Sequence, residues 1–366
     1  MPGLSLTVEL STPRILEQSA NSWVLRNDGT GTAPSKLHLS YSCVCVIPSG
    51  LFLFGGGHND YHGNDPWIFN ASTMTWSRVH DRDYDEYTSH DTRWAACSLS
   101  YPGSYAPVGQ SNPYHPVGRH TGSALAYDPT VGKVLMSGYA FDSYVDYDWP
   151  WGPTPGSCSS VGDVWFFDPE SGLWEWQFAN ENDVNKNRIT SIVYNPNDGK
   201  NYLINTKIDN YGRYYSFDAS EDSNIGANLY SGEPGLPGVC PASIDINQNK
   251  IYFLGTSGIK VFDISTSTLS TLTGITGSLP SGDGYGITYD SYNQLFLMFG
   301  AAGLYAFDPE TKVCSAITDA STPPSNAGSN SWVFGAWQYD AKNNVAWYVE
   351  RTVAGTNARV WTYRYA

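Results

Sequence analysis

The sequence predicts an all-β fold, a β-propeller of four-stranded antiparallel blades, and three observations support this prediction. The 366 residues include 36 Gly, 22 Pro, 26 Tyr and 13 Trp, while only 15% are charged. This composition is typical of short strands joined by turns and not of helices. An aromatic residue followed by Asp recurs along the chain, and Phe217, Phe262 and Phe307 stand at equal intervals of 45 residues. A repeat of about 40–50 residues with four short strands is the size of one propeller blade.

One pattern of strands and turns repeats through the chain. An apolar strand ends in Tyr-Asp, Tyr-Asn or a similar pair, and a turn and a second apolar strand follow. After a variable loop, a further strand ends in an aromatic residue plus Asp or Asn. Asp in such positions favours turns, so we expect Asp168 and Asp308 to be structural. In chain order, the pattern fills residues 40–79, 123–176, 190–220, 242–272, 285–317 and 334–365. The sequence therefore predicts six blades.

The last unit holds only three strands, and the N-terminal region has to supply the fourth. Residues 1–36 contain two stretches that can do so, "LSLTVEL" and "SWVLRN". A strand from this region closes the ring and leaves no free edge at the joint. We therefore expect one propeller domain over residues 1–366. Two long insertions, residues 80–118 and 141–162, leave the first two blades, and the first insertion could hold a degenerate seventh blade.

Glycines and aromatic residues in the first two units carry a family resemblance. Gly55, Gly56 and Gly57 follow an apolar strand, an aromatic residue lies in the next strand, and Trp76 or Trp174 lies in the last. In these features the chain resembles kelch repeats, which implies a kelch-like propeller. The resemblance implies no particular function, because this fold carries enzymes, binding proteins and scaffolds alike.

Charge and hydropathy limit the expected partners. A net charge of -15 at pH 7 argues against nucleic acid and anionic membrane surfaces as general partners. No apolar run approaches the roughly 18 residues that a membrane-spanning helix needs. The opening "MPGLSLTVEL" lacks the basic and apolar regions of a secretory signal, so the compartment stays open. We expect a monomer.

The six cysteines include no CxxC motif, which argues against a zinc ribbon or a thioredoxin-like site. Cys43 and Cys45 stand two positions apart in one strand, and we expect them in the core. Cys97 and Cys158 lie in the long insertions and could pair in an oxidising compartment. No cofactor is predicted. A metal ion stays open, because stretches rich in His and Asp are present but none has the spacing of a strong ligand motif.

Blade topology predicts where a site can form. In an up-and-down blade, the loop that enters the innermost strand and the loop that leaves the second strand open at the same end of the ring. Cations, imidazoles and tyrosines gather at these positions in the first three units, although the chain has only 20 Lys and Arg and seven His. The predicted site residues are His58, Asn59, Tyr61, Arg119, His120, Tyr139, Arg188, Lys207, Tyr211 and Arg213.

Several of these residues have a structural alternative. His58 could cap the turn after the three glycines, and Tyr139 and Tyr211 could simply pack against neighbours. Arg119 and His120 open an innermost strand, where side chains point to the wet axis of the ring. This position favours a functional role for both.

The residue types suit β-elimination on an acidic polysaccharide. The C5 hydrogen of a uronate becomes acidic once its carboxylate is neutralised, and arginine is well suited to this task. A neutral His or Tyr can then remove the proton, and a second His or Tyr can protonate the leaving oxygen at C4. The first predicted function is therefore a polysaccharide lyase with a uronate-containing acidic polysaccharide as its partner.

In residue types and in the face they occupy, the predicted site residues resemble those of propeller-type polysaccharide lyases such as the ulvan lyases. The resemblance implies that Arg119 and Arg188 bind the uronate carboxylate. It also implies that His120 or Tyr211 is the base and that His58 or Tyr139 is the acid. Further contacts with the substrate would come from Lys207, Asn59, Tyr61 and Arg213. A lyase of this kind would be secreted or extracellular.

Two other classes of function stay open. A propeller without catalytic activity could bind carbohydrate or protein, as an adhesion or viral module does. A copper-radical oxidase of the galactose-oxidase kind shares the kelch propeller and needs a tyrosine, two histidines and a cysteine crosslinked to tyrosine. Residues of these types on the predicted face are His58, His120, Tyr139 and Cys240.

Overall fold

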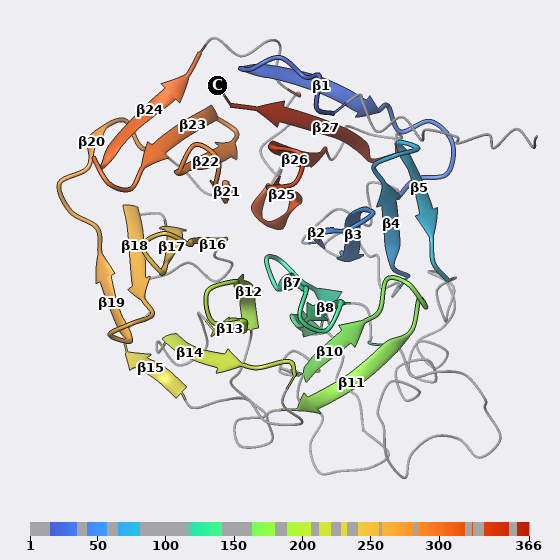
Figure 1. Cartoon of the computed structure of the whole chain (residues 1–366), viewed down its shortest axis with the longest axis horizontal. Coiled ribbons are helices and arrows are strands. Elements are labelled where there is room, and N and C mark those ends of the chain that lie inside the picture. Colours follow the sequence, from blue (N-terminus) through green and yellow to red (C-terminus); the bar gives the residue numbers. More distant parts are fainter. Residues whose placement is uncertain are drawn as a thin grey trace, which may run out of the picture.

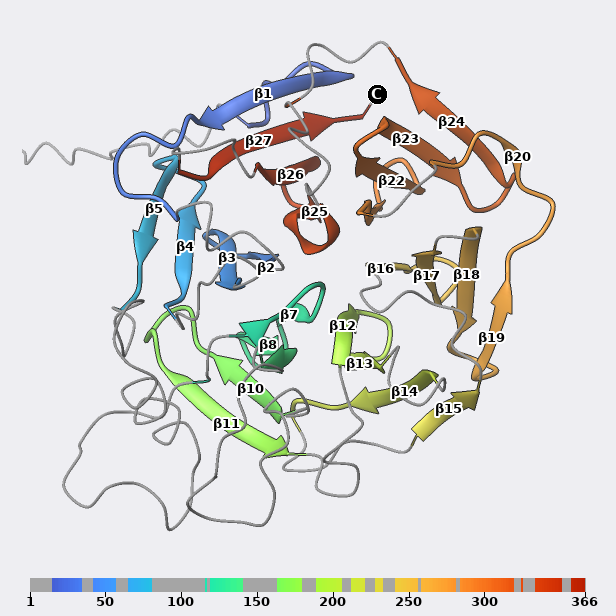
Figure 2. The ribbon, with the colours of Figure 1, turned by 180° about the vertical axis from the view of Figure 1, so that it is seen from behind.

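The computed structural model shows an all-β propeller. It describes residues 15–34, 42–56, 65–80, 116, 119–140, 163–179, 189–205, 212–220, 228–232, 241–255, 258–280, 284–318, 324, 333–350 and 357–365. Within them, six four-stranded antiparallel blades stand in a ring (Figure 1, and Figure 2 from behind). The predicted fold class is confirmed. None of the described segments forms a helix with the length and apolar character that crossing a membrane requires.

Each of blades 1 to 5 takes its strands from one stretch of the chain, from the innermost strand outward. Blade 1 contains β2 (Ser42–Ile47), β3 (Gly50–Gly55), β4 (Trp67–Asn70) and β5 (Thr75–Arg78). Blade 2 contains β7 (Leu125–Asp128), β8 (Lys133–Met136), β10 (Asp163–Phe167) and β11 (Trp174–Ala179). Blade 3 contains β12 (Ile189–Asn195), β13 (Lys200–Asn205), β14 (Gly212–Phe217) and β15 (Asn228–Gly232).

Blade 4 contains β16 (Ala242–Asp245), β17 (Lys250–Gly255), β18 (Gly258–Asp263) and β19 (Thr268–Thr271). Blade 5 contains β21 (Gly286–Asp290), β22 (Leu295–Gly300), β23 (Gly303–Asp308) and β24 (Val313–Ile317), and β20 (Thr276–Gly277) adds a short parallel strand to β24. Blade 6 contains β25 (Trp337–Asp340), β26 (Val345–Glu350), β27 (Arg359–Arg364) and β1 (Ser22–Asn27), and a 3-10 turn, η3 (Phe334–Ala336), precedes it. The two remaining short strands are β6 (Arg119–His120) and β9 (Tyr139–Ala140).

The ring closes with six blades. Each innermost strand, from β2 through β7, β12, β16 and β21 to β25, contacts the next, and β25 contacts β2. Most of residues 80–118, the stretch considered for a seventh blade, lies outside the described residues. The contacts between the six innermost strands nevertheless leave no gap for another blade at the axis.

The N-terminal strand β1 completes blade 6. It pairs antiparallel with β27, with Trp23 opposite Tyr363, and Figure 1 shows it along the outer side of that strand. Trp23 is buried, and its ring centroid lies 4.9 Å from that of Phe299 in blade 5. Of the two stretches considered, "SWVLRN" therefore forms the closing strand. The other, residues 4–10, lies outside the described residues.

Buried Asp and Asn residues build the turns that end the innermost strands. The Asp128 carboxylate accepts the backbone N–H of Thr130 at 2.8 Å. Gly132 closes this turn at φ +70°, in the left-handed region that glycine adopts without steric cost. Similar turns, in which the side chain accepts an N–H two or three residues later, follow Asn195, Asp245, Asp290 and Asp340.

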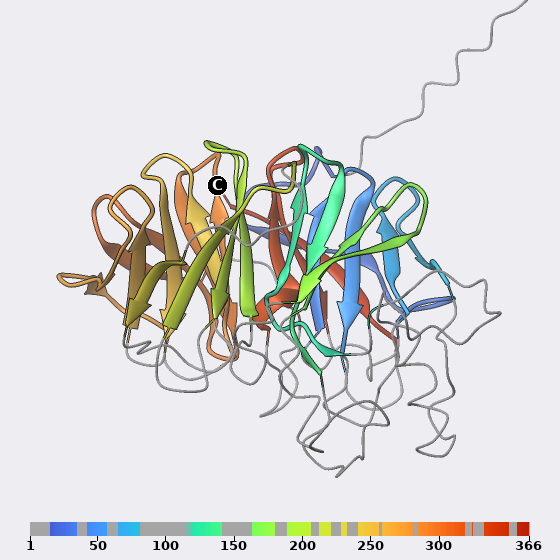
Figure 3. The same ribbon diagram turned by 90° about the horizontal axis from the view of Figure 1, so that it is seen from below.

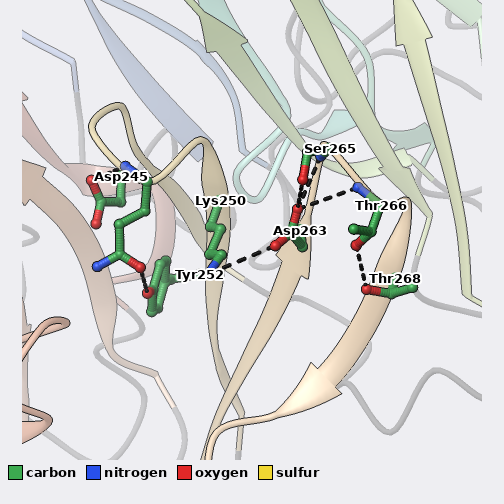
Figure 4. A network of polar contacts seen from close by, with 8 residues as sticks. Asp245, Lys250, Tyr252, Asp263, Ser265, Thr266 and Thr268 are labelled. Carbon is green, nitrogen blue, oxygen red and sulfur yellow. Dashed lines mark hydrogen bonds and ion pairs between the residues drawn. The ribbon is translucent and has the colours of Figure 1, made fainter.

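In each of blades 1 to 5, the turn between the third and fourth strands is also an Asx turn. In blade 4, which Figure 4 shows from close by, the Asp263 carboxylate accepts the N–H groups of Ser265 and Thr266 at 3.0 and 3.3 Å. Asp168 and Asp308 accept equivalent N–H groups in blades 2 and 5. The prediction that these two aspartates are structural is confirmed.

The hydrophobic core lies between neighbouring blades. The rings of Phe52 in blade 1 and Phe167 in blade 2 stack with centroids 4.5 Å apart. Blades 3 and 4 meet in the same way through Tyr214 and Phe262, whose centroids are 4.7 Å apart. Packing between sheets therefore fixes the position of each blade relative to the next.

Cys43 and Cys45 are free thiols and are buried in the core between blades 1 and 2, as predicted. Burial raises the pKa of the Cys43 thiol to about 12. Such a thiol stays protonated near neutral pH and is unreactive. Cys97 and Cys158, the pair considered for a disulfide, lie outside the described residues.

Candidate functional site

The two ends of the ring differ. Each innermost strand begins at one end, which we call the entry face, and finishes at the other, which we call the turn face because the Asx turns lie there. Figure 3 shows the ring from the side, with the turns along its upper edge. Because β6 precedes β7 and β9 follows β8, both short strands belong to the entry face.

Two of the predicted site residues stand opposite each other on the entry face. β6 and β9 pair antiparallel, with Arg119 opposite Ala140 and His120 opposite Tyr139. The loop into the innermost strand and the loop out of the second strand therefore meet at one end of blade 2, as the blade topology predicts. Arg119 directly precedes His120, so the backbone brings a cation, an imidazole and a phenol into one short ladder.

The other predicted residues divide into two groups. Arg213 is in β14, opposite Asn205 and Ser231, near the end of the strand that starts at the entry face. The remaining predicted site residues lie outside the described residues, and they are His58, Asn59, Tyr61, Arg188, Lys207 and Tyr211. Cys240, considered for a copper site, lies outside them too.

Hydrogen bonds fix the backbone next to β6 to both neighbouring blades. The buried Thr121 hydroxyl donates to the carbonyl of Phe54 in blade 1 at 2.9 Å. The N–H of Ser123 donates to the carbonyl of Thr190 in blade 3 at 3.2 Å, and the carbonyl of Ser123 accepts the N–H of Ile192 at 3.1 Å. Blades 1, 2 and 3 are thus tied together within three residues of His120.

The glycines before His58 have a conformational cause. Gly55 and Gly56 have φ values of +91° and +139°, which residues with a side chain rarely adopt. These glycines turn the chain at the end of β3 on the entry face. The turn itself therefore accounts for Gly55 and Gly56 without a functional role.

A cavity of about 400 Å³ lies on the axis toward the turn face. All six innermost strands line it, and the residues Pro129 and Pro196, which follow β7 and β12, also contribute. Four tyrosines from four blades belong to its wall, and they are Tyr127, Tyr194, Tyr289 and Tyr339.

Hydrogen bonds between blades occupy the polar groups on one side of this cavity. Ser243 in blade 4 accepts the N–H of Tyr289 in blade 5 at 2.9 Å. Thr288 in blade 5 accepts the N–H of Tyr339 in blade 6 at 2.8 Å. Burial, together with Asp245 nearby, raises the pKa of Tyr289. These groups therefore serve the joints between blades 4, 5 and 6.

Polar groups on the other side are not used in this way. Ser123 is 7% exposed, and its hydroxyl has no hydrogen-bond partner within the described part of the chain. Among the described residues, the hydroxyls of Tyr127 and Tyr194 and the amide of Gln338 also make no hydrogen bond. Burial raises the pKa values of Tyr127 and Tyr194, so both phenols are neutral donors near neutral pH.

Sequence reasoning did not identify this cavity. The signal was present, because the Tyr-Asp and Tyr-Asn pairs that mark the repeats place a tyrosine at the end of four innermost strands. We interpreted these pairs as turn markers only. Their convergence depends on how the blades meet at the axis.

Within the described residues, no group of three or more His, Cys, Asp or Glu is placed to hold a metal ion. No family model matches the chain, and no curated protein matches it.

Proposed function

We propose that the protein is a polysaccharide lyase that cleaves a uronate-containing acidic polysaccharide at the entry face. The observation that supports this proposal most strongly is the register of β6 and β9, in which His120 stands opposite Tyr139. Directly opposed residues of an antiparallel ladder have Cβ atoms about 4.5–5.5 Å apart. That spacing suits a base and an acid that serve neighbouring atoms of one sugar ring.

In the proposed reaction, Arg119 and Arg188 neutralise the uronate carboxylate, which makes the C5 hydrogen acidic. His120 or Tyr211 removes this proton. The electron pair forms a double bond between C4 and C5, and the bond from C4 to the bridging oxygen breaks. His58 or Tyr139 protonates that oxygen as it leaves. Lys207, Asn59, Tyr61 and Arg213 contribute further contacts with the chain of sugars. The reaction needs no cofactor, because side chains carry both protons.

The rigidity around β6 supports the same proposal. Catalysis by side chains depends on groups whose positions are fixed before the substrate arrives. The bonds from Thr121 to Phe54 and from Ser123 to Thr190 hold the chain after His120 against two neighbouring blades. The glycines Gly55 and Gly56 at the end of β3 support a kelch-like classification of the propeller, which is part of the proposal.

A panel of polymers of mannuronate and guluronate, galacturonate, glucuronate and iduronate tests the proposal. The unsaturated product of elimination absorbs in the ultraviolet, so its formation can be followed directly. We expect activity on at least one polymer, and a loss of about 10²–10⁴-fold in kcat for His120→Ala. Tyr139→Phe and Arg119→Ala are expected to lower activity as well.

Tyr292→Ala is a suitable control, because Tyr292 is 72% exposed and lies in a turn at the opposite face. This variant should keep full activity. If the wild-type protein forms no unsaturated product from any of the polymers, the lyase assignment is wrong. If His120→Ala is as active as the wild type, His120 is not the base, which leaves Tyr211 in that role.

A non-catalytic carbohydrate-binding propeller is the second candidate. The tyrosine-lined axial cavity favours it, because aromatic rings commonly contact sugar faces. The same panel separates the two candidates, since a binding protein would form no unsaturated product from any of the polymers.

A further inference from the structure

We propose that the axial cavity at the turn face is a second ligand site, which binds one neutral sugar unit. The cavity extends along β7 from Ser123, which precedes the strand and is three residues from His120, to Pro129, which follows the strand. The four tyrosines that line it lie near the ends of the innermost strands, away from β6. We therefore treat the tyrosine-lined cavity as a site distinct from the proposed catalytic site at β6 and β9.

The size and the wall of the cavity suit a small polar ligand. A volume of about 400 Å³ lies within the range of small-molecule sites, which are concave and largely preformed. The tyrosine rings offer flat apolar surfaces on which the C–H face of a sugar can stack. The rings come from blades 2, 3, 5 and 6, so they surround the axis.

The unpartnered polar groups indicate where the ligand binds. A buried hydroxyl without a partner is rare in a folded protein, since it has lost its water without gaining a hydrogen bond. Among the described residues Ser123 Oγ is such a group, and Ser123 belongs to the lining of the cavity. Tyr127 and Tyr194 of blades 2 and 3, and Gln338 of blade 6, also line the cavity, and their side chains make no hydrogen bond within the described part of the chain. Sugar hydroxyls both donate and accept, so a sugar can form hydrogen bonds with groups of either kind.

Two other hydroxyl side chains that line the cavity provide an internal comparison. Ser243 and Thr288 have the same chemistry as Ser123, but their hydroxyls already accept N–H groups of the next blade. Polar side chains in this cavity are therefore not left without partners as a rule. The free groups concentrate on blades 2, 3 and 6, and we infer that the ligand contacts these blades.

The charges near the cavity favour a neutral ligand. The described residues that line it include no Lys, Arg or His, so a uronate carboxylate would have no ion-pair partner there. The buried Asp128 and Asp290 adjoin the lining tyrosines and would repel an anion. A cation would also lack a direct partner, because the described lining residues include no carboxylate and the Asp290 carboxylate already accepts N–H groups of Tyr292 and Asn293.

Ligand-observed NMR and calorimetric titration of the full chain test the site. The neutral probes are glucose, galactose, mannose and their β-linked disaccharides, and the charged probes are glucuronate and choline. We expect at least one neutral probe to bind, with a Kd at least tenfold lower than that of either charged probe. No neutral binding overturns the proposal, and so does equal or tighter binding of choline. Because the proposed catalytic site also binds uronates, tight glucuronate binding overturns the proposal only if Ser123→Ala or Tyr127→Ala weakens it.

Variants locate the binding. Ser123→Ala removes a hydroxyl that has no partner among the described residues, so we expect unchanged thermal unfolding and a Kd raised about five- to tenfold. Tyr127→Ala should raise the Kd further. Tyr292→Ala, a matched change on an exposed tyrosine of the same face, should leave the Kd unchanged. Unchanged Kd values in both Ser123→Ala and Tyr127→Ala would contradict the location. None of these titrations uses a uronate polymer, so failure of the lyase assignment would not affect their outcome.

Discussion

At the scale of single residues, the buried aspartates of the turn face organise several donors at once. Asp340 is 4% exposed, and its carboxylate accepts hydrogen bonds from Asn343 Nδ2 at 2.6 Å and from the indole of Trp347 at 3.1 Å. It also accepts the backbone N–H of Asn343 at 3.2 Å. A carboxylate in such a place is stable only because these donors replace water.

Asp340→Ala is expected to lower the free energy of unfolding by about 2–3 kcal/mol, because the donors of Asn343 and Trp347 would be left without an acceptor. Asp340→Asn keeps one acceptor oxygen, as Asn195 does at the same position of blade 3, and should cost less. Urea denaturation followed by tryptophan fluorescence gives both values. If the two variants lose equal stability, the acceptor role assigned to Asp340 is wrong.

Asp263 predicts a pH dependence of stability. The Ser265 hydroxyl and the N–H groups of Thr266 and Ser265 hold the pKa of the Asp263 carboxyl below its ordinary value. A lowered pKa in the folded state stabilises the fold above the ordinary carboxyl pKa, and this stabilisation is lost as the pH falls through the folded-state pKa. Stability should therefore decrease below about pH 4.

Asp263→Asn should make this decrease shallower, because the variant has no carboxyl to protonate at that position. Urea unfolding at a series of pH values from neutral to acid measures the slope for both proteins. If the free energy of unfolding falls equally steeply with pH in the variant and in the wild type, Asp263 does not contribute to the loss of stability in acid.

At the scale of elements, β1 joins the two ends of the chain. Trp23 is the main apolar contact of this strand, and its ring lies 5.7 Å from that of Trp337 and 5.1 Å from that of Tyr363. Leu25, on the same strand, is 40% exposed. The strand therefore has a packed side and a solvent side, and its contribution to ring closure should come from the packed side.

Trp23→Ala is expected to destabilise the protein by about 3–5 kcal/mol, since a large buried ring is lost at the closure. Leu25→Ala, a control on the same strand, should change stability by much less. Guanidinium denaturation compares the two variants. A loss for Leu25→Ala as large as that for Trp23→Ala would mean that burial at this joint does not stabilise the ring.

The elements were largely predictable because their signals are local. Asp128 and Asp263 each fix a turn through N–H groups two or three residues later, so the hairpins can be recognised in the sequence itself. Local signals could not decide whether "LSLTVEL" or "SWVLRN" forms the closing strand. Both stretches contain enough apolar residues for a short strand, and the packing of Trp23 against Phe299, distant in the sequence, distinguishes the second.

At the scale of the whole molecule, the ring places different residues at its two ends. Blade topology was sufficient to predict that His120 and Tyr139 share the entry face, because it depends only on the order of strands. The axial cavity was not predictable. Its wall comes from six strands, and whether Ser123 has a partner depends on how closely the neighbouring blades approach.

The mass of the product of polymer cleavage tests the central claim most directly. Elimination breaks the chain without adding water, so each new non-reducing end should be lighter by one water than a hydrolysis product. We predict this mass for the wild-type protein with a uronate polymer, and its absence for His120→Ala. Products with the mass of hydrolysis would contradict elimination at the entry face, and the elimination product from both proteins would contradict the assignment of His120 as the base.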